Sequence, residues 1–240
     1  MDRGLYVAAT GMLAEMNRQD ALSNNLANLT TPGFKADRMR QREFASVLMT
    51  KREDGSARGT MSLGPVTDQI TGLSQGTVQQ TDSPLDLALR GDGFFAVRAA
   101  GAVAYTRNGQ FANNAQGQLV DAQGNLVLSR TGQPIQVGSN PDAVTVRPDG
   151  TVSVGANNVG QLQIVTLDNP RKTAESLWAG QPAGAAPAQV QQRALEASTS
   201  DATRTVIDMI ASQRSFESSQ RALRAIDESL QRAAQIGQVQ

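Results

Sequence analysis

The sequence contains no cysteine and no histidine among its 240 residues. Without cysteine the chain can form no disulfide framework and offers no thiol nucleophile. Without histidine it lacks the general base of Ser-His-Asp and Cys-His sites and a principal ligand of zinc. Only carboxylate, lysine, hydroxyl or tyrosine chemistry is left for catalysis. These absences predict a protein that is not an enzyme and that holds no metal or other cofactor.

Charge of neither sign dominates, because 22 lysine and arginine residues balance 22 aspartate and glutamate residues. Such a chain has no general attraction for nucleic acid or an anionic membrane, and we expect neither as a partner. Long apolar runs of about 18 residues are absent, so stable membrane insertion is not expected. The opening MDRGLYVAATGMLAEMNRQD lacks the apolar segment and cleavage site of a secretory signal. If the chain leaves the cytoplasm, we expect export without a cleaved signal peptide.

The N-terminal part of the chain repeats apolar or small residues at intervals of three, four and seven, which is the pattern of an amphipathic helix. The row includes Leu5, Met12, Met16 and Leu26. The spacing predicts a helix over residues 3–28.

The stretch LSNNLANLTTPGFK, residues 22–35, predicts where this helix ends. Asparagine competes with helical hydrogen bonding, Pro32 keeps the residue before it out of the helical region, and Gly33 permits a positive φ. One interpretation is that the stretch only stops the helix; the other is that its amides and the following side chains contact neighbouring chains. The side chains available for such contacts are Asn24, Asn25, Asn28, Phe34 and Lys35.

The middle of the chain changes to short apolar segments separated by turn-forming residues, which is typical of an antiparallel barrel or sandwich. The clearest hairpin is TVRPDGTVSV, in which valines alternate around Asp149-Gly150. Asn108-Gly109 and Gly124-Asn125 are expected to be tight turns of the same kind.

The last part of the chain predicts a long amphipathic helix that begins at about residue 198, with Ser200 or Asp201 as its N-cap. A heptad row places Met209, Phe216, Leu223 and Leu230 seven residues apart, with Val206 and Ile226 beside it. The other inward positions are expected to be Ser212, Gln213, Ser219 and Gln220.

The fold class that follows is α+β, with long N- and C-terminal helices that pair as a coiled-coil-like stalk and a central all-β domain. The expected organisation is an N-terminal helix and its stop at 1–34, an extended or mobile connection at 35–65, the β domain at 66–180, a Pro- and Ala-rich linker at 181–197 and a C-terminal helix at 198–240 that packs with 1–34.

Three motifs resemble one known family. Asn24-Asn25-Leu26-Ala27-Asn28, followed by Gly33-Phe34-Lys35, resembles the N-terminal signature of the bacterial flagellar basal-body rod and hook proteins. PLDLALRGDGFFAVR at 84–98 with AYTRNGQF at 104–111 is similar to the β-domain motif of that family, and MIASQRSFESSQRAL at 209–223 is similar to its C-terminal helix. The motifs occur in the order of the family and cover both ends and the middle of the chain.

The resemblance implies a structural subunit of the flagellar rod, exported by the flagellar type III apparatus and polymerised helically in the periplasm. The short chain and its MDRGLY start resemble the proximal rod proteins most, and the distal rod proteins are a close alternative. The implied partners are other copies of the chain, other rod and hook proteins, and the export apparatus. The residues expected at subunit contacts are Leu5, Met12, Met16, Asn24, Asn25, Leu26, Asn28, Gly33, Phe34, Met209, Phe216, Leu223, Ile226 and Leu230.

Two other classes of function are weighed against an assembly subunit. A soluble adaptor or secretion chaperone would use the C-terminal helix to bind one partner helix. A glycosidase would need two carboxylates such as those among Asp82, Asp86 and Asp92, but the β-domain motif accounts for these residues as parts of turns.

Limited proteolysis of the monomer tests the assembly class. If the two helices order only on polymerisation, the ends of the free chain are cut and a core within roughly 65–180 survives. Ends that resist digestion in the monomer would instead favour a closed pair of helices and the adaptor.

Overall fold

A computed structural model of the chain describes residues 2–42, 47–50, 57–61, 66–174 and 176–237. The chain divides into two compact units, which we name the helical unit and the β unit. The helical unit comprises 1–27, 37–72 and 202–240, and the β unit comprises 28–36 and 73–201. Both units are therefore built from segments that are distant in the sequence.

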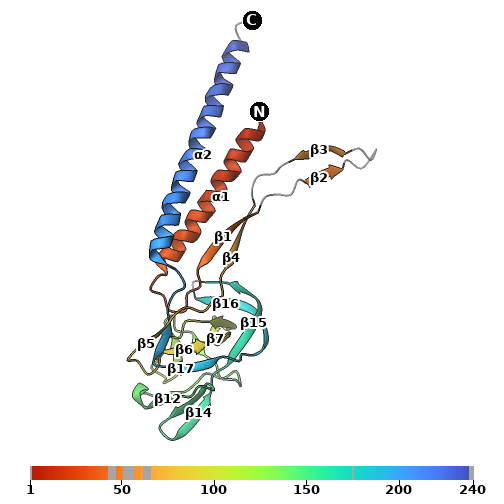
Figure 1. Cartoon of the computed structure of the whole chain (residues 1–240). Coiled ribbons are helices and arrows are strands. Elements are labelled where there is room, and N and C mark those ends of the chain that lie inside the picture. The colour runs from red at the N-terminus through yellow and green to blue at the C-terminus, as the bar shows by residue number, and fades with distance from the viewer. Residues whose placement is uncertain (1, 43–46, 51–56, 62–65, 175, 238–240) are drawn as a thin grey trace. The chain divides into compact units, whose positions relative to one another are not determined.

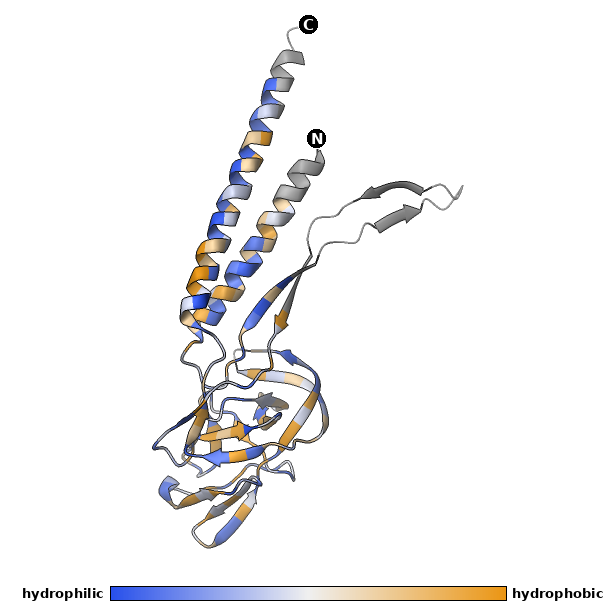
Figure 2. Cartoon of the chain, in the orientation of Figure 1, coloured by the Kyte–Doolittle hydropathy of each residue, from blue (hydrophilic) through white to orange (hydrophobic). Residues whose placement is uncertain are grey.

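Two antiparallel helices form the larger part of the helical unit (Figure 1). α1 spans Asp2–Ala27 and α2 spans Ala202–Gly237. The bounds agree closely with the prediction: α1 ends one residue before Asn28, and α2 begins directly after the expected cap position Asp201. Hydrophobic and hydrophilic residues mix along both helices, so each is amphipathic (Figure 2).

Four strands complete the helical unit. They are β1 (Asp37–Arg42), β2 (Val47–Thr50), β3 (Ala57–Met61) and β4 (Val66–Thr71), of which β1 pairs with β4 and β2 with β3, both antiparallel. The connection expected at 35–65 is thus largely built of paired strands where it is described, and residues 51–56 and 62–65 of the predicted mobile part lie outside the described residues. Composition alone indicated an extended or mobile connection, because the pairing of these strands is set by backbone hydrogen bonds and not by an apolar pattern.

The β unit is an antiparallel β domain that contains a small barrel. β7, β8, β16 and β15 pair in succession, and an additional pairing of β15 with β7 closes the ring. A three-stranded sheet β12-β13-β14 and the pairs β6–β17 and β5–β18 lie outside that ring. The strands are β5 (Val78–Gln80), β6 (Leu87–Arg90), β7 (Phe94–Ala99), β8 (Ala102–Thr106), β9 (Phe111–Asn113), β10 (Leu119–Asp121), β11 (Leu126–Val127), β12 (Val144–Val146), β13 (Thr151–Val154), β14 (Asn157–Gln161), β15 (Ile164–Lys172), β16 (Leu177–Ala185), β17 (Gln189–Gln192) and β18 (Ala194–Glu196), with a 3-10 turn at Pro141–Ala143.

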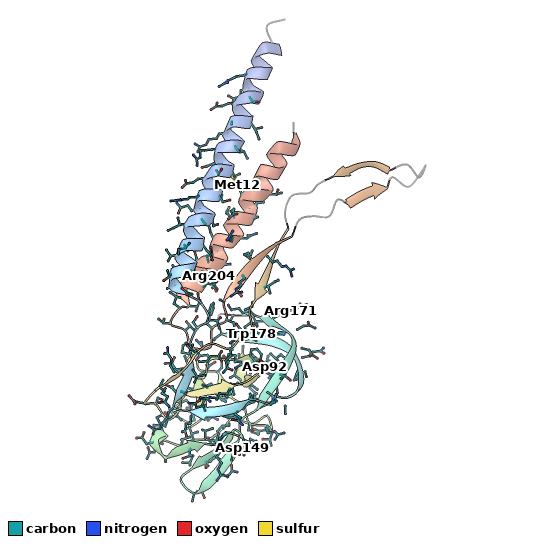
Figure 3. All side chains as sticks on the ribbon, viewed as in Figure 1. Met12, Asp92, Asp149, Arg171, Trp178 and Arg204 are labelled. Carbon is teal, nitrogen blue, oxygen red and sulfur yellow. The ribbon has the colours of Figure 1, made fainter. Side chains whose placement is uncertain are left out.

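Strand β7 is buried on both faces and separates two hydrophobic clusters. Phe95 and Val97 point into the larger cluster, where the Phe95 ring packs edge-on against Phe111 at 5.2 Å between centroids. Phe94 lies on the opposite face in the smaller cluster and packs on Trp178 at 5.6 Å. Figure 3 shows Trp178 among the strands of this unit. The alternation of a strand therefore places successive aromatics in different cores.

Two of the three predicted turns connect paired strands. Val144 pairs with Val154 and Val146 with Val152 across Asp149-Gly150, where Gly150 has φ +82°. Gly124-Asn125 turns between β10 and β11 in the same way, with φ +85° at Gly124. In both turns an aspartate at the start accepts the amides that follow it, as in Asx turns.

Asn108-Gly109 was predicted as a hairpin turn, and that prediction is wrong. β8 pairs with β7 and β16, whereas β9 pairs with β10, so the dipeptide connects strands that are not neighbours. Glycine is needed there for a different reason: a Cβ on Gly109 would lie 1.6 Å from the carbonyl oxygen of Leu87.

The linker predicted at 181–197 is also wrong. These residues form the end of β16, then β17 and β18, which pair with β15, β6 and β5 respectively. The end of β16 is rich in alanine, glycine and proline and is exposed, so it carries no apolar alternation. Its partners are distant in the sequence, and local composition cannot indicate them.

Truncation of the Phe95 side chain on β7 tests this account of the core. Phe95 has no exposed surface, and Phe95→Ala should lower the free energy of unfolding by ~3–5 kcal/mol. The control Val103→Ala removes a side chain that is 52% exposed on β8 and should cost under about 1 kcal/mol. Urea unfolding of both variants measures the difference, and equal effects would contradict the assignment of Phe95 to the core.

Candidate functional site

The asparagine-rich stretch folds as a tight turn that leads from α1 into the β unit. The amide of Thr31 donates to the Asn28 carbonyl at 3.4 Å, and the amide of Phe34 donates to the Thr31 carbonyl at 3.3 Å. The Thr31 hydroxyl also donates to Asn28 Oδ1 at 3.0 Å. Gly33 adopts φ +68°, as its glycine led us to expect. The helix-stop interpretation of this stretch therefore describes its local structure.

Position 33 requires glycine because of a close backbone contact as well as its positive φ. A Cβ at this position would lie 2.3 Å from the carbonyl oxygen of Arg107. The Gly33 amide donates to the carbonyl of Glu196 at 2.7 Å. The segment thus lies directly on the backbone of two other parts of the β unit.

Phe34 is buried within the β unit and is 1% exposed. The ammonium of Lys172 lies 3.8 Å from the centre of its ring, a cation–π contact. Its carbonyl accepts the amide of Thr199 at 3.0 Å. Phe34, expected at a subunit contact, thus makes its described contacts inside its own chain.

Lys35, expected as a polar rim contact, is buried in an ion cluster with Glu196 and Arg107. Lys35 Nζ lies 2.5 Å from Glu196 Oε1, and Arg107 Nη1 lies 3.1 Å from Glu196 Oε2. All three side chains are at most 3% exposed. One carboxylate therefore balances two buried cations, which makes it the group on which the cluster depends.

Burial lowers the pKa of both cations of this cluster. Desolvation is the main cause for Lys35, partly offset by its hydrogen bond to Glu196 and its attraction to that carboxylate. Desolvation also lowers the pKa of Arg107, and Glu196 and Asp92 oppose the shift by attraction. Arg107 is held further by donating to the Gly91 carbonyl at 2.7 Å and by lying over the Phe94 ring at 5.5 Å.

Asn25 is engaged inside the helical unit. Its side-chain amide donates to the Asp37 carbonyl at 2.7 Å, and its Oδ1 accepts the Asp37 amide at 2.8 Å. Asp37 Oδ1 in turn accepts the Thr71 hydroxyl at 2.6 Å. Asn25 thus ties the end of α1 to the start of β1, and both Asn25 and Asn28, expected at subunit contacts, are buried within the chain.

The two helices meet along a row of small side chains. Ala14 and Ala21 are buried on α1, and Thr205 and Ser212 are buried on α2. The Ser212 hydroxyl donates to Glu15 Oε2 at 2.6 Å across the pair. Small residues permit close approach of two helix backbones.

The predicted heptad residues Met209, Phe216, Leu223 and Ile226 are half-buried on α2. Ser219 is half-buried beside them, whereas the expectation that Gln213 and Gln220 point inward is wrong because both are exposed. On α1, Met12 (Figure 3), Asn24 and Leu26 are half-buried and Met16 is exposed. The side chains of Leu5 and Leu230 lie outside the described residues, although both positions belong to the helices.

Large apolar side chains remain exposed on both helices. Leu13 is 59% exposed and Met16 49% on α1, and Ile207 is 61% exposed on α2. Val206 and Ile210 lie on the same face of α2 as Ile207 and are also exposed. We name these five residues the apolar face; it is turned away from the row of small residues on each helix.

Sequence reasoning missed Glu196 entirely, since it fell in the predicted linker. The available signal was the alternation in QVQQRALE, in which Val190, Ala194 and Glu196 are all buried. Arg107 and Lys35 lay inside motifs that were noticed, but their pairing across 89 and 161 residues with Glu196 could not be read from spacing.

Asp121 and Gly91 lie in turns of the β unit. Asp121 Oδ1 accepts the amides of Gln123 and Asn125, which is the hydrogen bonding of a turn. Gly91 of Arg90-Gly91-Asp92 has φ +101°, as a turn requires. Within the described residues, no helix is long and apolar enough to cross a membrane.

Comparison with known proteins agrees with the motifs. The family described as "Flagella basal body rod protein" matches residues 5–35, "Flagellar hook protein FlgE/F/G D1 domain" matches 88–154, and "Flagellar basal body rod FlgEFG protein C-terminal" matches 191–236. The flagellar basal-body rod protein FlgF of Caulobacter vibrioides is 34% identical over 226 residues, which cover 91% of each chain. FlgG of Bacillus subtilis is 32% identical over 260 residues, covering 96% of this chain and 97% of that protein.

A pair of helices joined to an antiparallel β domain, with these three matches, defines the class of axial structural proteins of the bacterial flagellum. This chain belongs to the flagellar basal-body rod protein family, and it is a structural rod subunit. The family is structural and not enzymatic, so the glycosidase alternative is set aside.

The ion cluster predicts unequal costs for its members. Glu196→Gln leaves two buried cations without their counter-ion and should destabilise the β unit by ~3–5 kcal/mol. Lys35→Met leaves the Arg107–Glu196 pair intact and should cost under about 1.5 kcal/mol. Thermal or urea unfolding decides, and a larger effect of Lys35→Met would contradict this balance of charges.

The lowered pKa of Lys35 also predicts a pH dependence. The folded chain releases this proton at lower pH than the unfolded chain, so the contribution of Lys35 to the free energy of unfolding rises with pH up to its ordinary pKa of 10.5. The difference in stability between wild type and Lys35→Met should therefore become more favourable to wild type from about pH 8 to about pH 10. Urea titrations at both values test the sign, and a decrease would refute it.

Proposed function

We propose that the chain is a proximal rod subunit that polymerises helically through its two helices to form part of the shaft that crosses the periplasm. The observation that carries the proposal is the division of each helix into two faces. Small residues serve the intrachain pair, while the apolar face is left exposed.

A coiled-coil-like pairing of α1 and α2 is part of the proposal. Among the described buried and half-buried positions on α2, all except Asp208 follow one another at alternating spacings of four and three, which is the heptad pattern. These positions are Thr205, Met209, Ser212, Phe216, Ser219, Leu223 and Ile226. The mixture of hydroxyls with apolar residues fits a helix that has several neighbours.

The partner of the apolar face in this proposal is a helix of a neighbouring rod subunit. Burying one of its large side chains is worth ~1.5–3 kcal/mol, so five of them supply a substantial contact. Exposed leucine, isoleucine and methionine on the two helices are unfavourable in a monomer but useful in an assembly. Other copies of this chain and other rod and hook proteins are the partners that the family membership supports.

The proximal position is supported by chain length. The alignment with FlgG of Bacillus subtilis spans 260 residues, more than the 240 of this chain, so it contains residues that this chain lacks. The alignment with FlgF of Caulobacter vibrioides spans 226 residues, fewer than the 240 of this chain. A distal rod subunit of the same family is the alternative, and an assembly adaptor is a weaker one.

Export by the flagellar type III apparatus without a cleaved signal peptide completes the proposal. It rests on the membership of the chain in the rod protein family. The balanced charge gives no reason to include nucleic acid among the partners.

A charge placed on the apolar face tests assembly. Ile207→Glu should leave the monomer folded, because Ile207 is 61% exposed, but should weaken subunit association by roughly 30-fold or more, the equivalent of ~2 kcal/mol of lost burial. The matched control Val103→Glu changes an exposed residue of the β unit and should assemble normally. Sedimentation of polymers and counts of rods in a strain that lacks its own copy measure both variants, and normal assembly of Ile207→Glu would refute the role of this face.

Position in the rod separates the proximal subunit from the distal one. The chain has no cysteine, so Val103→Cys carries a unique thiol for labelling on an exposed residue of the β unit, outside the apolar face. Labelled subunits in purified hook-basal bodies should lie at the end of the rod nearest the inner membrane. Label next to the hook would assign the chain to the distal rod instead.

A further inference from the structure

The chain passes between its two units four times. The crossings follow Ala27, Ala36, Gly72 and Asp201. Any force transmitted along the backbone between the helical unit and the β unit must therefore pass through the segments 28–36, 73–77 and 196–201 of the β unit. We name these three segments the connectors.

Glu196 contacts the other two connectors and the body of the β unit. Its Oε1 binds Lys35 Nζ and accepts the amide of Gly76 at 2.7 Å, and its Oε2 accepts Arg107 Nη1 at 3.1 Å. Its backbone carbonyl accepts the amide of Gly33 at 2.7 Å. A single residue thus holds all the segments by which the chain enters and leaves the β unit.

Further hydrogen bonds join the connectors to one another around this residue. Ala36 donates to Thr199 Oγ1 at 2.9 Å, and Ala197 donates to the Thr77 carbonyl at 2.8 Å. Lys35 Nζ also donates to the Ser74 carbonyl at 2.7 Å. Gly76 has room for no side chain, since a Cβ would lie 2.2 Å from the Ala197 carbonyl oxygen. The connectors are therefore packed backbone against backbone.

We propose that Glu196 is the positioning residue of a joint that clamps the three connectors together, so that the β unit carries load as one body when the rod turns. The part of this proposal that concerns load rests on the proposed rod function. The clamping part depends only on contacts inside the β unit.

The charges of the joint come from separate parts of the sequence. Lys35, Arg107 and Glu196 fall one each within the three segments that match the family. Because one carboxylate pairs with two cations, the loss of Glu196 should disrupt the joint more than the loss of Lys35. Without Lys35 the Arg107–Glu196 pair remains, whereas without Glu196 neither cation has its ion pair.

Hydrogen exchange measured by mass spectrometry on the full chain tests the clamp. Glu196→Gln should speed exchange at least tenfold in peptides covering 33–36, 74–77 and 196–199, with the β12–β13 hairpin at 144–154 unchanged. The matched control Glu228→Gln changes an exposed carboxylate on α2 that pairs only with Arg232 among the described contacts, and should alter neither set. A uniform rise over the whole β unit, or no rise at all, would overturn the proposal.

Lys35→Met provides a second variant should Glu196→Gln fail to fold. It should release residues 33–36 while the Gly76 amide stays protected, because Glu196 and Arg107 remain in place. Unchanged protection of 33–36 would overturn the clamp.

Swimming at increasing viscosity then tests the load. Cells with Glu196→Gln should lose speed more steeply than wild-type cells, and an identical dependence would overturn the role in bearing load. Failure of the wild-type chain itself to enter rods would instead refute the rod function and leave the exchange result to decide the clamp.

Discussion

A buried carboxylate that must neutralise two buried cations is the constraint on which this structure depends. Lys35 and Arg107 lose their hydration on folding, and only Glu196 lies close enough to replace it with direct ion pairs among the described contacts. The requirement brings together residues near the start, the middle and the end of the sequence. The turn at Gly33, the burial of Phe34 and the pairing of β18 all place their segments where this charge balance can form.

The two helices differ from the β unit, because the fully buried side chains between them are small. Alanine, serine and threonine bring α1 and α2 close together but bury little apolar area, which leaves the larger side chains for contacts outside the chain. The same protein therefore combines a β unit that buries two hydrophobic clusters with a helical unit that leaves large apolar side chains exposed. Such a division suits a subunit that is stable alone in one part and completes its burial only in an assembly.

Much of the fold could be predicted from periodicity. α1, α2 and the 144–154 hairpin have strong local patterns, and their bounds were found within a few residues. The strands at 177–196 could not be predicted, because an exposed Ala- and Gly-rich ribbon has no alternation and its partners are remote. The asparagine-rich stretch was recognised, but whether Phe34 faces its own β unit or a neighbour depends on tertiary packing that no spacing reports.

The strands that complete the β unit come last. β17 pairs with β6 and β18 with β5, so strands near residues 78–90 have no partners until residues 189–196 exist. During synthesis from the N-terminus, β5 and β6 emerge before their partner strands and have unpaired edges. Lys35 likewise precedes its counter-ion Glu196 by 161 residues. The β unit consequently cannot complete its strand pairing until the last part of the chain has been synthesised.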